Sequence, residues 1–76
     1  MVTPLELLRA FEEDNLKFIA WESETIGVLS RVKETFRDNV MQQWCDYFIS
    51  ISQYEIENLT KEIEDDRRKA EEFSTI

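Results

Sequence analysis

The sequence contains no histidine and has one residue each of cysteine, proline and glycine. Because Cys45 is alone, the chain forms no internal disulfide, and a single thiol without histidine cannot build the usual four-ligand zinc site. Histidine-dependent catalytic triads are excluded for the same reason. Gly27 by itself is too little for the glycine-rich loops that hold phosphate groups. We therefore predict a protein that is not an enzyme and that binds no cofactor and no metal.

Long hydrophobic runs are also missing. No run approaches the roughly 20 residues that span a bilayer, and the N-terminal residues lack the basic and then apolar layout of a signal peptide. The expectation is a soluble protein of a reducing compartment, the cytoplasm.

Basic residues are few, with nine Lys and Arg against 17 Asp and Glu, so that the formal net charge is −8. Binding to phosphate groups is driven by clustered Lys and Arg. The charge therefore argues against nucleic acid as a direct ligand and against an anionic membrane surface.

Apolar residues, by contrast, are abundant: they make up 42% of the chain and include two Trp, two Tyr and five Phe. This content is too high for a disordered chain. The 76 residues make one domain, 1–76, and a monomer of this size has only a marginal core. Since disulfides and metals are excluded, self-association is the remaining way to stabilise it.

The longest regular pattern lies in the second half of the chain. Its residues recur in steps of three and four, which is the spacing of a seam between two helices. A second apolar line runs beside it and ends at Tyr54, so the helix needs several neighbours up to that point and one neighbour beyond it. The seam is formed by Cys45, Ile49, Ser52, Ile56, Leu59, Ile63, Asp66, Ala70 and Phe73, and the second line by Val40, Trp44, Phe48 and Ile51.

The first half of the chain predicts another long helix. Thr3 is placed to cap it, Pro4 suits its first position, and Glu6 completes a capping box. Glu22 falls on its apolar line, as Asp66 does in the second half. Because charged residues are seldom fully buried without a partner, we expect both acids at an exposed edge of the seam. Leu5, Ile19 and Ile26 widen one side of this line, and Leu7, Trp21 and Val28 widen the other. The line itself consists of Leu8, Phe11, Phe18, Thr25, Leu29, Val32 and Phe36, with Asn15 also falling on it.

The best turn candidate is the segment 37–39, where Asp38 or Asn39 can cap a new helix. It divides the domain into helical arms at 4–37 and 40–72, each about 33 residues and about 50 Å long, with a loose tail at 73–76. Equal arms predict an all-α fold, a long antiparallel helical hairpin. The alternative is three helices, with a break near 22–27, where the chain is polar and contains Gly27.

Two amphipathic arms do not bury each other fully, so we expect two hairpins to dimerise into a four-helix bundle. The predicted function is protein–protein interaction, as a small acidic adaptor, regulator or assembly subunit in homodimeric form. The partner is expected to be another protein. The residues predicted to make the dimer or partner interface are Trp44, Phe48, Ile49, Ile56, Leu59 and Ile63.

A different hypothesis is an acidic inhibitor that mimics nucleic acid and blocks a basic groove of a nucleic-acid-binding protein. It would present the acidic residues of the second arm, and its binding would weaken steeply with added salt. The residues assigned to this acidic face are Glu55, Glu57, Glu62, Glu64, Asp65 and Asp66.

Overall fold

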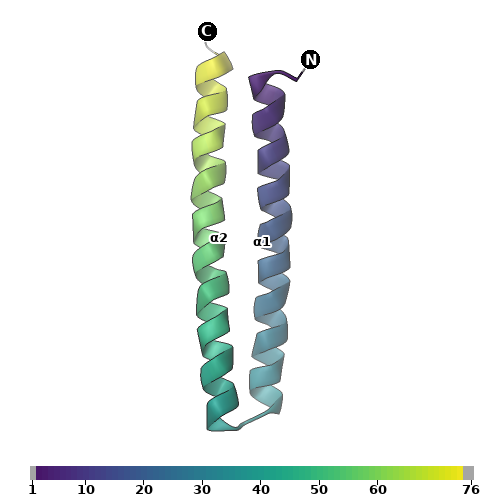
Figure 1. The fold of residues 1–76 in the computed structure, drawn as a ribbon, viewed down its shortest axis with the longest axis vertical. Helices are drawn as coiled ribbons and strands as arrows, with labels where there is room; N and C mark the ends of the chain where they lie inside the picture. Colours follow the sequence, from purple (N-terminus) through teal and green to yellow (C-terminus); the bar gives the residue numbers. More distant parts are fainter. Residues whose placement is uncertain (1, 75–76) are drawn as a thin grey trace.

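The protein is a hairpin of two long helices. A computed structural model describes the backbone of residues 2–74 and the side chains of residues 2–72. Within them the chain forms α1 (Pro4–Thr35) and α2 (Asn39–Ser74), with no strand. The helices lie side by side and antiparallel, with the turn at one end and both termini at the other (Figure 1). The predicted all-α hairpin is therefore confirmed.

The start of α1 follows from its capping sequence. The backbone N–H of Glu6 donates to the Thr3 hydroxyl at 3.2 Å, and the backbone N–H of Thr3 donates to the Glu6 carboxylate at 3.2 Å. This reciprocal pair satisfies two N–H groups that have no partner inside the helix. Pro4 opens the helix, where it loses no hydrogen bond.

The connection between the helices is short and tight. The backbone N–H of Phe36 donates to the carbonyl of Val32 at 2.9 Å, and Phe36 itself is extended, which ends α1. The N–H of Gln42 then donates to the carbonyl of Asp38 at 2.9 Å and begins the α2 ladder. The connecting residues are thus 36–38, one position before the predicted turn. At its other end α2 extends to Ser74, and residues 75–76 of the predicted tail lie outside the described residues.

The segment 22–27 contains no break, so α1 is one continuous helix and the three-helix alternative is wrong. Gly27 keeps a negative φ, and a side-chain carbon at this position would meet nothing within 4 Å. A glycine costs a helix only about 1 kcal/mol relative to alanine, which packing along α2 readily offsets.

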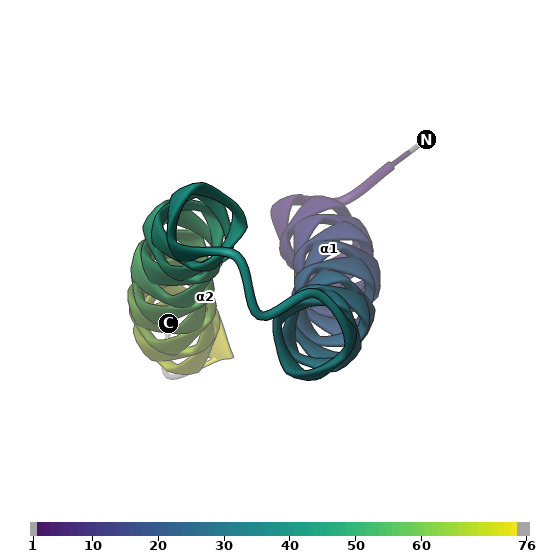
Figure 2. The ribbon, with the colours of Figure 1, turned by 90° about the horizontal axis from the view of Figure 1, so that it is seen from below.

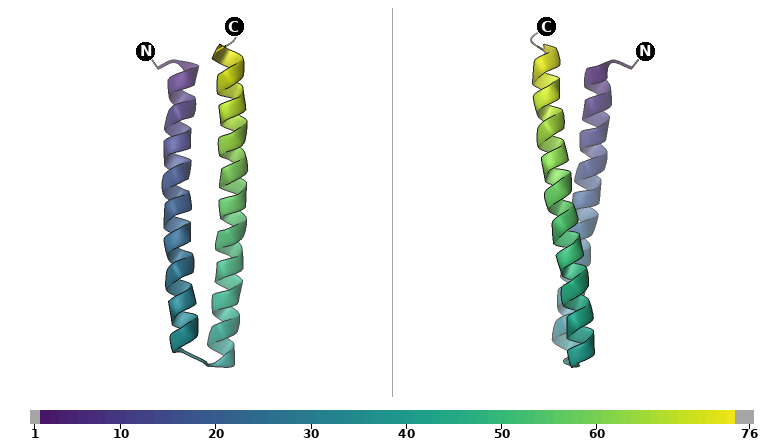
Figure 3. Two further views of the ribbon diagram at one scale, coloured as in Figure 1. Left: turned by 180° about the vertical axis from the view of Figure 1, so that it is seen from behind. Right: turned by 60° about the vertical axis from the view of Figure 1, so that its left-hand side comes forward.

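The predicted seam of α2 packs against α1. Cys45, Ser52 and Ile63 are buried, with 2%, 5% and 5% of their surface exposed. Five further members are half-buried, and the side chain of Phe73 lies outside the described part. The two helices are seen end-on in Figure 2 and from two further sides in Figure 3, where they cross at a shallow angle. The half-buried members of the seam are Ile49, Ile56, Leu59, Asp66 and Ala70.

The contact stripe of α1 differs from the predicted line. Leu8, Leu29 and Val32 are half-buried as expected, but Phe11 and Phe18 are about half exposed. The physical reason is the area that one helix can cover. At 100° per residue, the two aromatic positions lie to one side of the stripe that meets α2, and they stay exposed. The stripe that meets α2 instead consists of Leu5, Leu8, Glu12, Asn15, Ile19, Glu22, Ile26 and Leu29.

Polar bonds between the helices fix their register. Arg67 Nε donates to Glu12 Oε1 at 2.6 Å near the open end. Near the turn, Lys33 Nζ pairs with Asp46 Oδ1 at 2.6 Å. Such exposed pairs contribute only about 0–1 kcal/mol each, so they select the alignment of the helices more than they stabilise it.

The seam leads to a stability prediction. Ile63→Ala removes a side chain that α1 covers almost completely, and we expect it to lower the free energy of unfolding by about 2–4 kcal/mol. The neighbouring exposed substitution Glu64→Ala should stay within about 0.5 kcal/mol of the parent protein. Urea unfolding followed by circular dichroism, at one protein concentration throughout, measures both. Equal midpoints for the two variants would contradict the seam.

Candidate protein-interaction surface

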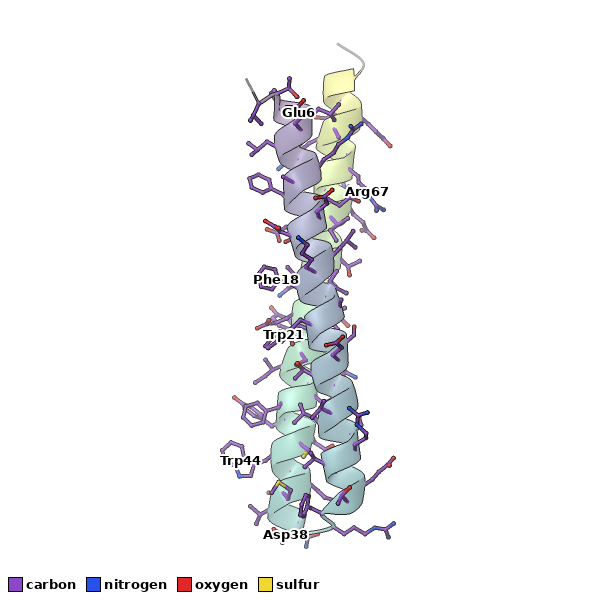
Figure 4. All side chains as sticks on the ribbon, turned by 90° about the vertical axis from the view of Figure 1, so that its right-hand side faces the viewer. Glu6, Phe18, Trp21, Asp38, Trp44 and Arg67 are labelled. Carbon is purple, nitrogen blue, oxygen red and sulfur yellow. The ribbon has the colours of Figure 1, made fainter. Side chains whose placement is uncertain are left out.

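A band of large apolar side chains is left exposed along one side of the hairpin, and we call it the apolar face. Between 38% and 65% of each residue remains accessible. Figure 4 shows Phe18 and Trp21 of α1 and Trp44 of α2 projecting from the same side. By helical position, the face comprises Leu7, Phe11, Phe18, Trp21 and Val28 on α1, and Val40, Trp44, Tyr47, Phe48, Ile51 and Tyr54 on α2.

Three rings of α2 form a cluster within this face. Trp44 stacks on Phe48 with ring centroids 5.7 Å apart, and Tyr47 meets Phe48 edge-on at 5.5 Å. The Trp44 and Tyr47 rings are also perpendicular, at 6.4 Å. The cluster presents an aromatic surface of the kind that anchors protein interfaces.

A groove of about 650 Å³ lies in the apolar face between the two helices. Phe18 of α1 and Tyr47, Ile51 and Tyr54 of α2 contribute its apolar walls, and Glu22 lies at its side. Glu55 and Asn58 also line it, while no Lys or Arg does. The groove is therefore an apolar depression with two carboxylates and no basic residue to pair with them.

Glu22 corrects one prediction, because only 8% of it is exposed. The rotation of α1 that puts its aromatic rings outside also brings position 22 onto the seam. Asp66, the other expected edge residue, is half-buried. Among the described residues no buried side-chain nitrogen or oxygen lacks a partner, which agrees with a Glu22 side chain that reaches the open groove with its carboxylate.

The apolar face is uneven along the length of the hairpin. In the half nearest the turn, both helices contribute to it. In the open half only Leu7 and Phe11 of α1 do, because the described residues of α2 beyond Tyr54 include no exposed large apolar side chain. We call residues 18–54 the turn half and the remainder the open half.

The structure divides the predicted interface residues into two groups. Trp44 and Phe48 lie on the apolar face, 56% and 45% exposed. The other four point toward α1 of the same chain. Phe18 and Trp21, which dominate the face on α1, were not among the predicted set, although their spacing with Leu7, Phe11 and Val28 follows one side of a helix. The four residues that α1 covers are Ile49, Ile56, Leu59 and Ile63.

The six acidic residues of the second arm do not share one side of α2. Glu62 accepts a hydrogen bond from Asn15 at 3.4 Å, and Asp65 pairs with Arg68 at 2.9 Å. Glu55 lines the groove. At 100° per residue, Glu57 and Glu64 fall on a different side from these three.

Comparison with protein-family models, with curated proteins and with solved structures finds no match to this chain. Neither described helix is long and apolar enough to cross a membrane. Over residues 2–74, no three His, Cys, Asp or Glu side chains are grouped so as to hold a metal ion. The functional argument therefore depends on the apolar face.

The position of Glu22 generates a prediction. Glu22→Leu replaces a carboxylate on the seam with an apolar side chain, and we expect it to stabilise the protein by about 1–2 kcal/mol. The thermal midpoint should rise by several degrees, because about 1 kcal/mol corresponds to about 4–8 °C in a domain of this size. The matched control is Glu24→Leu, at an exposed position two residues away. A midpoint that falls in the Glu22 variant would mean that this carboxylate makes a stabilising contact.

Proposed function

We propose that this protein is a non-enzymatic protein–protein interaction module that acts as a homodimer. Two hairpins join through their apolar faces and form a four-helix bundle. The observation that carries this proposal is the apolar face itself, in which 11 large side chains are 38–65% exposed on one side of a 76-residue chain. An exposed apolar surface of this extent is typical of an interaction site.

The accessible surface of the single hairpin supports the proposal. It measures 6231 Å² for a mass of 9.1 kDa. A compact monomer of that mass exposes about 4,900 Å². The hairpin thus leaves about 1,300 Å² more in contact with water than a compact monomer would. A covering partner removes this excess.

The hairpin buries few apolar residues between its helices. Cys45 and Ile63 are the buried apolar residues of the described chain, and no described large side chain is fully enclosed. Two helices in contact shield only one stripe on each, whereas four helices enclose a core between them. Assembly of two hairpins supplies the core that one hairpin lacks.

The size of the face fits a second copy of the chain. An aromatic side chain offers about 150–250 Å², so the half-exposed residues of the face amount to on the order of 1,000 Å² per copy. Two copies that covered most of it would bury about 1,200–2,000 Å² in total, the range of stable protein interfaces. The charged sides of both hairpins would remain outside, available for another protein partner.

The test compares two neighbouring positions. Phe18→Glu places a charge in the apolar face, and we expect it to convert a dimer of twice 9.1 kDa into a monomer, whether folded or unfolded. Leu16→Glu is the matched control: Leu16 is 48% exposed, but two residues, or about 200°, around the helix from Phe18. The Leu16→Glu variant should stay dimeric. Trp44→Glu repeats the test from α2.

Size-exclusion chromatography with light scattering measures the mass of each variant at equal concentration. If the parent protein has the mass of one chain at micromolar concentration, the homodimer is rejected. If Phe18→Glu and Trp44→Glu both remain dimeric like Leu16→Glu, the dimer forms through another surface.

A further inference from the structure

We propose that the two copies pair with their turns at the same end of the bundle, so that α1 of each hairpin lies opposite α2 of the other. This inference rests on the proposed homodimer and specifies its geometry. It follows from the uneven distribution of apolar residues along the hairpin.

Two hairpins that meet face to face can be related by a two-fold axis in two ways. If the axis runs parallel to the helices, the two turns lie at the same end of the bundle. Residues at a given distance from the turn in one copy then meet residues at the same distance from the turn in the other. Rotation about this axis also exchanges the two sides, which puts α1 opposite α2. If the axis runs perpendicular to the helices, across the hairpin, the turns lie at opposite ends of the bundle. The α1 helices then face each other, as do the α2 helices, and the turn end of one copy meets the open end of the other.

With the axis along the hairpin, the apolar turn half of one copy meets the apolar turn half of the other. Because Lys33 pairs with Asp46, the ring cluster at Trp44, Tyr47 and Phe48 is level with the last turns of α1. It then faces the last turns of α1 from the second copy, the segment that carries Val28. Val28 and the three rings are about half exposed in the single hairpin.

With the hairpins overlapped along their full length, the axis across the hairpin produces a larger mismatch. It lays the ring cluster of α2 against the open half of α2 from the second copy. That segment offers Asn58, Lys61, Glu62 and Asp65, all exposed and polar. Rings pressed against these groups would strip water from charges without giving them partners, which is costly. With the turns together, the same polar segment meets Leu7 and Phe11 of the second copy, two side chains in place of the three-ring cluster.

The distance between the two turns of the dimer distinguishes the two arrangements. Asp38 is exposed in the turn, and Asp38→Cys in a Cys45→Ala background carries one nitroxide spin label per chain. Pulsed electron spin resonance then measures the label-to-label distance in the dimer. With turns together, two helix diameters separate the labels, and we expect a distance under about 25 Å. With turns apart, it approaches the hairpin length, about 50 Å.

Ser23→Cys in the same background is the matched control, because this exposed position near mid-length gives a short distance in either arrangement. Arg37→Cys is the second turn position if the label at 38 disturbs folding, as judged by circular dichroism. A short distance at Ser23 with about 50 Å at the turn overturns this inference and leaves the homodimer standing. A monomeric mass for the labelled proteins and the parent overturns both.

Discussion

Two helices in contact enclose no interior, and this constraint governs the structure. Each helix covers the other along one narrow stripe, to which α2 contributes Cys45, Ser52 and Ile63 as its most buried members. Phe18, Trp21, Trp44 and their neighbours lie to one side of that stripe and form the apolar face. The exposed surface follows from the limited area that one helix can cover.

The same constraint explains why the stripe tolerates polar residues. At its edges a polar side chain keeps some contact with water, so Glu12 and Asn15 lie on the α1 stripe without strong penalty. Both form hydrogen bonds across to α2, at 2.6 Å with Arg67 and at 3.4 Å with Glu62. Such contacts hold one alignment of the helices, and the apolar groups remain free for assembly. The hairpin thus has a well-defined shape but a small store of hydrophobic stabilisation.

Division of the apolar face into two halves connects the fold to the proposed function. Near the turn, both helices offer apolar surface at the same level, as a core shared with a second copy requires. Beyond Tyr54, α2 is polar on the corresponding side, and its charged residues remain in water. In a bundle with the turns together, a stable centre near the turns would support an open end whose charged surface is free to meet another protein.

The sequence by itself determined the two helices and the cap of the first, because Thr3, Pro4 and Glu6 satisfy a helix start locally. It placed the turn within one position of the observed connection at 36–38. It also determined the α2 seam, since steps of three and four persist from Cys45 to Ala70 on one side of a helix. Which stripe of α1 meets that seam was decided only by the tertiary structure. Apolar residues flank the predicted line of α1 on both sides, and only the packed pair of helices fixes which flank meets α2. For that reason Glu22 became buried, Phe18 and Trp21 became the exposed surface, and four of the six predicted interface residues turned toward the hairpin's own first helix.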